Sequence, residues 1–181
     1  RVYLSEAREK TGSVSIHEEI MLQGLVIGYA KMDREERREF LDEFVPKIGN
    51  WAVCDSCVNS YKFMQKEPDY WFDYLKTYQT SREEFRLRFM IVAMMSHFVD
   101  EKHIDEILDI CGKIRHDGYY TKMGVAWTLQ VCYVKFPEQT RALLKNTPVL
   151  LLDEPHSYLD RENLQWLEAY MKQSSKTIVY I

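Results

Sequence analysis

Trp51 and Asp55 are the residues of this chain whose types and spacing are best suited to chemistry. They lie four positions apart in the segment Trp51-Ala-Val-Cys-Asp55, and this spacing puts them on one side of an α-helix, one turn apart. A carboxylate beside a large aromatic ring can stabilise positive charge on a bound molecule. The same pair also fits an ordinary buried contact, so the rest of the sequence has to distinguish the two.

Two further segments combine aromatic and basic residues at helical spacing. Arg86 and Arg88 lie in Phe85-Arg-Leu-Arg88-Phe, and Lys122 and Trp127 lie in Tyr120-Thr-Lys122-Met-Gly-Val-Ala-Trp127. Taken singly, each has a plainer interpretation. A tryptophan on an apolar helix usually belongs to the core, and the two arginines fit a surface face that pairs with nearby glutamates.

The pair Cys54-x-x-Cys57 has the spacing of half a zinc site or of a redox motif. No second CxxC or HxxxH completes it, so we interpret the four cysteines as packing residues in a reducing cytoplasm and expect neither a metal nor a cofactor.

Composition fits a globular protein but gives little hint of a partner. Hydrophobic residues make up 46% of the 181 residues, and 24 basic against 28 acidic residues give a net charge of −4. This balance argues weakly against nucleic acid, although the distribution of basic residues matters more than their sum. The longest apolar runs are too short to cross a bilayer, and we expect a monomer without membrane contact.

Capping signals and apolar stripes predict one helix after another. The expected N-terminal caps are Ser15, Asp33, Ser81, Asp100 and Asp160. The segment 119–136 is apolar on most sides, which predicts that it is largely buried. The expected helices span residues 2–10, 16–31, 34–48, 51–65, 68–75, 82–97, 100–117, 119–136, 137–145 and 161–173.

The helices form pairs of roughly 35–40 residues joined by short loops, which favours an all-α solenoid of HEAT-like helical hairpins. An irregular helical bundle is the alternative. After Asn146 the pattern changes to an apolar run at 149–152, a helix and a second strand-like run at 176–181. We therefore expect two parts, a helical domain over 1–146 and a tail over 147–181 that is either a graft or a cap on the array.

The three segments around Trp51, Arg88 and Trp127 resemble, in order and spacing, the AlkD-like family of DNA alkylation-repair glycosylases. The resemblance covers residues 1–146 and implies a HEAT-like solenoid. The resemblance does not account for the helices that this family has at its N-terminus, so we expect an N-terminally truncated domain. The substrate that the resemblance implies is double-stranded DNA carrying positively charged N3- or N7-alkylated purines.

The resemblance also implies a role for each site residue. Trp51 and Trp127 would flank the deoxyribose of the damaged nucleotide, and Asp55 would stabilise the cationic sugar and orient the attacking water. Arg88, Lys122 and, beside them, Arg86 would bind the DNA backbone. The chemistry suits these residue types, because a cationic base leaves without a general acid and the remaining oxocarbenium-like charge is stabilised by a carboxylate.

The tail resembles a second family, the F-type ABC ATPases. Val149-Leu-Leu-Leu-Asp153-Glu154-Pro is similar to a Walker B strand, and Leu159-Asp160 is similar to a D-loop. The sequence has no Gly-x-x-x-x-Gly-Lys-Ser/Thr loop to hold phosphates. A DNA glycosylase is therefore the leading hypothesis, a non-catalytic DNA- or protein-binding module the second, and a fragment of an ABC-type ATPase the third.

Overall fold

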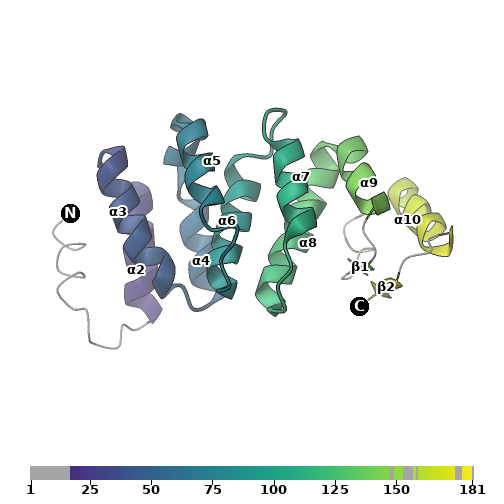
Figure 1. Ribbon diagram of the computed structural model, residues 1–181, viewed down its shortest axis with the longest axis horizontal. Coiled ribbons are helices and arrows are strands. Elements are labelled where there is room, and N and C mark those ends of the chain that lie inside the picture. Colours follow the sequence, from purple (N-terminus) through teal and green to yellow (C-terminus); the bar gives the residue numbers. More distant parts are fainter. Residues whose placement is uncertain (1–16, 147–148, 153–156, 158, 174–176, 181) are drawn as a thin grey trace.

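The chain forms a series of helices joined by short turns (Figure 1). The computed structural model describes residues 17–146, 149–152, 157, 159–173 and 177–180. The expected helix 2–10 and the Ser15 cap lie outside the described residues. The elements are α2 (His17–Tyr29), α3 (Arg34–Phe44), η1 (Val45–Lys47), α4 (Trp51–Asn59), η2 (Lys62–Lys66), α5 (Pro68–Lys76), α6 (Glu84–His97), α7 (Ile104–Lys113), α8 (Tyr119–Lys135), α9 (Pro137–Asn146), β1 (Val149–Leu152), α10 (Arg161–Gln173) and β2 (Thr177–Tyr180).

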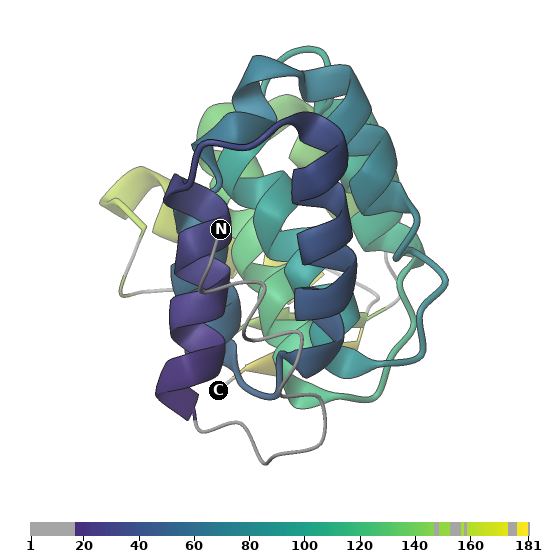
Figure 2. The same ribbon diagram turned by 90° about the vertical axis from the view of Figure 1, so that its left-hand side faces the viewer.

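The helices from α2 to α9 form two layers, which Figure 2 shows with α2 and α3 side by side. We call α2, α4, α6 and α8 the inner helices, because each packs against the next and together they carry the candidate site. Each inner helix is followed by a helix of the other layer, so the four inner helices run parallel. Their N-terminal ends consequently lie along one edge, the lower one in Figure 1. This arrangement confirms the predicted HEAT-like all-helical domain.

Contacts between neighbouring repeats recur at a separation of 33 residues. Hydrogen bonds at this separation join His17 to Asn50, Arg34 to Glu67 and Asp55 to Arg88. The inner helices begin at residues 17, 51, 84 and 119, so successive repeats span 33 to 35 residues, at or slightly below the lower end of the expected 35–40.

Glycines allow the first two inner helices to approach closely. A Cβ atom at Gly24 would overlap Cys57 and Phe44, and one at Gly28 would overlap Ser60. These two glycines are therefore required for the close helix contact, since any side chain here would push α2 away from α4.

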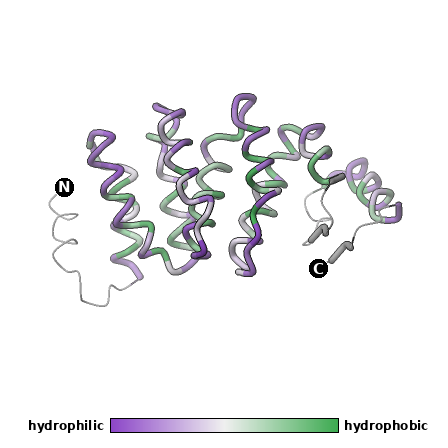
Figure 3. Tube along the Cα trace, viewed as in Figure 1, coloured by the Kyte–Doolittle hydropathy of each residue, from purple (hydrophilic) through white to green (hydrophobic). Residues whose placement is uncertain are grey.

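The core is a continuous cluster that runs through the array, with α6 at its centre. Ten of the fourteen residues of α6 are buried, whereas α3 is mainly hydrophilic and buries Arg37, Phe40, Leu41 and Phe44 (Figure 3). Burial on most sides explains why α6 lacks a polar face and why it holds the neighbouring inner helices in register.

Several predicted helix boundaries are wrong, because polar side chains close local turns before or after the helix. Ser81 accepts a hydrogen bond from the Glu83 amide, so α6 begins at Glu84. Asp100 accepts bonds from the amides of Lys102 and His103, and α7 begins only at Ile104. The helices expected over 34–48 and 51–65 end at residues 44 and 59, and they are followed by the short η1 and η2 helices. The predicted caps Asp33 and Asp160 are confirmed by bonds from the Glu36 and Asn163 amides.

The prediction that segment 119–136 is largely buried is wrong. Only Thr121, Gly124, Thr128 and Cys132 of α8 are buried. These residues follow the helical repeat along one face that packs on the core. Tyr119, Met123 and Trp127 lie on another face and remain exposed. The apolar residues of α8 therefore form an exposed surface as well as a contact with the core.

The C-terminal strands pair in parallel, with Val149 opposite Thr177 and Leu152 opposite Tyr180. Helix α10 connects them and packs on the end of the array. The Trp166 ring stacks on Tyr133 at a centroid distance of 6.0 Å, and the Tyr170 hydroxyl donates to the Leu144 carbonyl. On α10, Leu167 is buried and Leu164 and Met171 are half-buried. No helix among the described residues has the length and hydrophobicity needed to cross a membrane.

Candidate functional site

The N-terminal part of α4 presents Trp51 and Asp55 on adjacent turns. Asn50 caps this helix, and its side chain accepts a hydrogen bond from the Val53 amide at 2.9 Å. Trp51 is the first residue of α4 and is 53% exposed, whereas Asp55 is 8% exposed. The aromatic ring therefore faces solvent beside a carboxylate that the array encloses.

Asp55 is held by Arg88 of α6 in a bidentate ion pair. The Arg88 Nε donates to Oδ1 at 3.0 Å, and Nη2 donates to Oδ2 at 2.7 Å. Arg88 is 3% exposed. A buried pair of this geometry is charge-assisted and fixes the orientation of the carboxylate. Each carboxylate oxygen has a second lone pair, so Asp55 keeps the capacity to accept a bond from a ligand or water.

The same arginine fastens α8 to this pair, because Arg88 Nη1 donates to the Tyr120 carbonyl at 2.7 Å. One turn earlier on α6, the Glu84 carboxylate accepts from the amides of Tyr120 at 2.6 Å and Thr121 at 3.4 Å. Glu84 thereby satisfies donors at the N-terminus of α8. Together, Glu84 and Arg88 fix the first turn of α8 relative to Asp55.

The second predicted tryptophan lies on α8 and is 40% exposed. Trp127 follows Gly124 by one turn, and Gly124 packs beside the Arg88 side chain. Lys122 and Met123 are also exposed on this helix. The structure thus brings Trp51, Asp55, Arg88 and α8 together across three consecutive inner helices.

Arg86 is not part of this cluster. It lies two positions before Arg88, on a different face of α6, and its Nε lies 2.6 Å from Glu83 Oε2 in an ion pair. The surface pairing weighed as the plain interpretation of the sequence thus describes Arg86, whereas Arg88 is buried with Asp55. Whether Arg86, Arg88 or Lys122 also contacts DNA stays a prediction.

The cysteines that flank Asp55 belong to the core. Cys54 and Cys57 are free, buried thiols. Burial raises the pKa of Cys57 to about 12 and raises that of Cys54 as well. These thiols therefore stay protonated near neutral pH and are poor nucleophiles. Within the described residues, no cluster of three or more His, Cys, Asp or Glu side chains could hold a metal ion.

Reasoning from the sequence missed Glu84 and Met123. Glu84 was interpreted as a surface residue, although its spacing of four from Arg88 puts both on one face of α6. This spacing was the available signal. The exposure of Met123 had no comparable signal, because a methionine on an apolar helix is usually buried.

These features agree with the comparison of the sequence with known protein families. The chain belongs to the DNA alkylation repair enzyme family, whose sequence model matches residues 7–176.

The chain also has partial similarity to ABC ATPases, which agrees with the second resemblance noted in the sequence. It is 51% identical to the ATP-binding protein Uup of Escherichia coli (strain K12) over 41 residues, which is 23% of this chain and 6% of that protein. It is 28% identical to the energy-dependent translational throttle protein EttA of Haemophilus influenzae over 168 residues, 87% of this chain and 27% of that protein. The chain thus spans well under a third of either relative, and no solved structure matches it.

Proposed function

We propose that this protein is a DNA glycosylase that releases positively charged alkylated purines, such as N3- and N7-alkyl bases, by hydrolysis of the N-glycosidic bond. The observation that carries the proposal is the Asp55 carboxylate, held by Arg88 beside the exposed Trp51 in a chain of the DNA alkylation repair family. The cationic base leaves without protonation. Asp55 then stabilises the oxocarbenium-like charge on the sugar and orients the attacking water.

The two tryptophans have a separate role in this proposal. Trp51 and Trp127 offer exposed aromatic faces to the sugar and the cationic nucleotide. The ring faces exclude water and align the glycosidic bond with Asp55. Recognition therefore rests on positive charge and shape around the sugar, and no general acid is needed.

DNA would lie along the N-terminal ends of the inner helices. Lys122 and Trp51 both lie in the first or second turn of an inner helix, where the helix dipole favours phosphate groups. This local arrangement makes the edge favourable for phosphate groups, although the chain as a whole carries a net charge of −4. Lys122, Arg86 and the remaining donors of Arg88 are the proposed backbone contacts. We expect a monomeric protein acting in the cytoplasm.

The test is the release of N7-methylguanine from methylated duplex DNA, measured for the wild type and for Asp55→Asn. We expect release by the wild type and none by the variant, with equal helical content by circular dichroism. Undiminished release by Asp55→Asn would rule out Asp55 as the catalytic group.

One observation favours a second candidate, a non-catalytic binding module. Both oxygens of Asp55 are already engaged by a buried arginine, which is also the arrangement of a purely structural ion pair. A module of this kind would bind duplex DNA in a salt-dependent manner, and neither the wild type nor Asp55→Asn would release base.

For residues 147–181 we propose the role of a cap on the array. Contacts of Trp166 and Tyr170 with α8 and α9 support this role, and terminal repeats of solenoids need such covers. A chain that ends at Asn146 should lose thermal stability and retain its helices. Unchanged melting would contradict the cap.

A further inference from the structure

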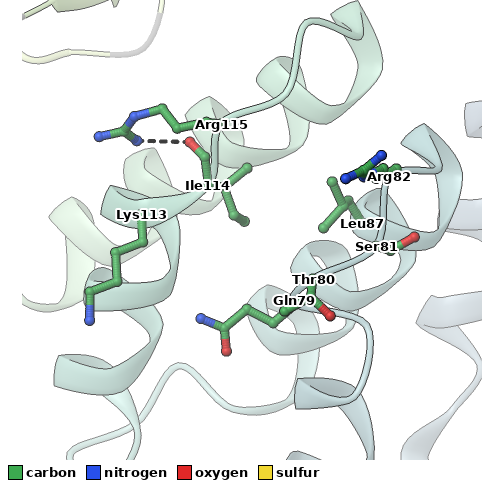
Figure 4. Close-up of a pocket in the computed structure, with 8 residues that line it drawn as sticks. All are labelled: Gln79, Thr80, Ser81, Arg82, Leu87, Lys113, Ile114 and Arg115. Carbon is green, nitrogen blue, oxygen red and sulfur yellow. Dashed lines mark hydrogen bonds between the residues drawn. The ribbon is translucent and has the colours of Figure 1, made fainter.

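A groove at the edge of the array combines several cationic side chains and has no acidic lining residue among the described ones (Figure 4). Its volume is about 320 Å³. One wall is the loop before α6, and the other is the C-terminal end of α7 with the loop before α8. The lining residues are Gln79, Thr80, Ser81, Arg82, Leu87, Lys113, Ile114 and Arg115.

The positive charge of this groove is only partly neutralised. Arg115 donates to the carbonyls of Gly112 and Ile114, at 2.7 and 2.8 Å, and these bonds hold it without cancelling its charge. Within the part of the chain that the structure describes, neither Arg82 nor Arg115 forms a salt bridge. Of the three cations, Lys113 alone has a carboxylate partner, Asp109 at 2.6 Å.

The two glutamates that follow Arg82 in the chain are engaged elsewhere. Glu83 pairs with Arg86, and Glu84 accepts the amides at the start of α8. The local excess of positive charge therefore differs in sign from the chain as a whole, which carries −4. A cationic groove that is only partly neutralised, with neutral donors at Thr80 and Ser81, is suited to an anion.

The location of the groove connects it to the candidate site. The two loops that form it lead directly into α6 and α8, at the edge where the inner helices begin. His116, in the loop before α8, is hydrogen-bonded through Nε2 to the Arg82 carbonyl at 3.1 Å, so the two walls are joined. Glu84 lies between the groove and the Asp55 pair. A nucleic acid strand bound along this edge passes both.

We propose that this groove binds a phosphodiester of the DNA backbone away from the damaged nucleotide, with Arg82 and Arg115 as its main contacts. The inference rests on the proposed function for the identity of the ligand. It adds a second point of attachment, which fixes the direction of the strand that crosses Trp51 and Trp127.

The experiment measures binding of undamaged, fluorescein-labelled duplex DNA as a function of salt for the double variant Arg82→Gln/Arg115→Gln. We expect roughly tenfold weaker binding at about 0.1 M salt, and a slope of log K against log salt that is smaller by about 1–2, because each lost phosphate contact contributes about 0.9.

The matched control is Lys31→Gln/Lys172→Gln, which removes two positive charges from exposed positions outside the groove. This control should leave the salt slope at the wild-type value. Equal slopes for the two double variants would overturn the groove proposal. Binding of tripolyphosphate that depends on Arg82 and Arg115, with an unchanged DNA slope, would overturn it too and indicate a site for free phosphates.

The outcome for the groove is separable from the outcome for the proposed function, because undamaged DNA is bound without base release. A groove-dependent slope in a protein that releases no N7-methylguanine would contradict the glycosylase and support the groove.

Discussion

Arg88 of α6 holds both carboxylate oxygens of Asp55 from the neighbouring inner helix, at 3.0 and 2.7 Å. Both residues are buried, so removing one leaves an uncompensated charge inside the protein. We expect Arg88→Ala to lower the free energy of unfolding by about 3–5 kcal/mol. Asp55→Asn likewise leaves the Arg88 charge uncompensated, but it keeps one acceptor oxygen for the arginine and should cost somewhat less. Urea denaturation of both variants measures the difference, and a cost below about 1 kcal/mol for Arg88→Ala would contradict this account.

Substitution of the exposed tryptophans should affect base release much more than the stability of the fold. Trp51→Ala and Trp127→Ala should each lower base release about 10- to 100-fold, since stacking on one nucleotide contributes about 1–3 kcal/mol. Their effect on unfolding should stay within about 1 kcal/mol, because both rings are largely exposed. Trp71 is the control, since it is 1% exposed and its change to alanine should cost about 3–5 kcal/mol. If the exposed tryptophans proved as destabilising as Trp71, they would be core residues.

Glu84 is expected to act on the site through the position of α8. Glu84→Ala removes the acceptor for the Tyr120 and Thr121 amides, and loss of such a helix cap costs about 0.5–2 kcal/mol. We expect slower base release with little change in DNA affinity. Glu84→Gln keeps an acceptor oxygen and should restore most of the rate. Equal rates for the alanine and glutamine variants would show that the hydrogen bonds do not position the site.

Lys122 should contribute one phosphate contact, because it is exposed on α8 near Trp127. Lys122→Gln should weaken DNA binding and lower the salt slope by about 1. Arg86→Gln should have a smaller effect, since Arg86 is paired with Glu83. The measurement is the salt dependence of duplex binding, and a larger effect for Arg86 than for Lys122 would reverse our assignment.

Stability should fall at alkaline pH because of the buried thiols. Burial raises the pKa of Cys57 to about 12 and that of Cys132 to about 11. Above pH 9 the unfolded state loses these protons while the folded state keeps them, so stability is full below about pH 9 and declines as pH rises towards 11 or 12. Each thiol contributes up to about 1.4 kcal/mol per pH unit in its window.

The check is the pH dependence of the unfolding free energy between pH 8 and pH 11 for the wild type and Cys57→Ala. The variant should be less stable at pH 8, because it leaves a cavity, and should lose stability less steeply above pH 9. Parallel curves would mean that Cys57 ionises equally in both states.

Helical periodicity was sufficient to predict the class of fold and most helices. It failed where one polar side chain closes a turn, as Ser81 and Asp100 do, because a capping motif and a turn motif have the same local sequence. It also failed for α8. Apolar residues there were assigned to the core, but an apolar surface and an apolar core contact look alike in sequence.

The candidate site was less predictable. Trp51 and Asp55 lie on one helix, so their spacing alone predicts that they are neighbours. The pairing of Asp55 with Arg88 depends on two helices 33 residues apart, and no local pattern determines that register. The family resemblance named Arg88 as a phosphate contact, which stays a prediction, and it did not indicate that this side chain is bound to Asp55.

The burial of α6 has a consequence for the exchange of its amide hydrogens. Because this helix is enclosed by the inner helices on both sides, its amides should open only with global unfolding. Arg88, which orients the Asp55 carboxylate, therefore lies on the helix that we expect to open least often. The two tryptophans project from its less buried neighbours, α4 and α8, so a substrate can meet exposed rings while the charged centre stays fixed.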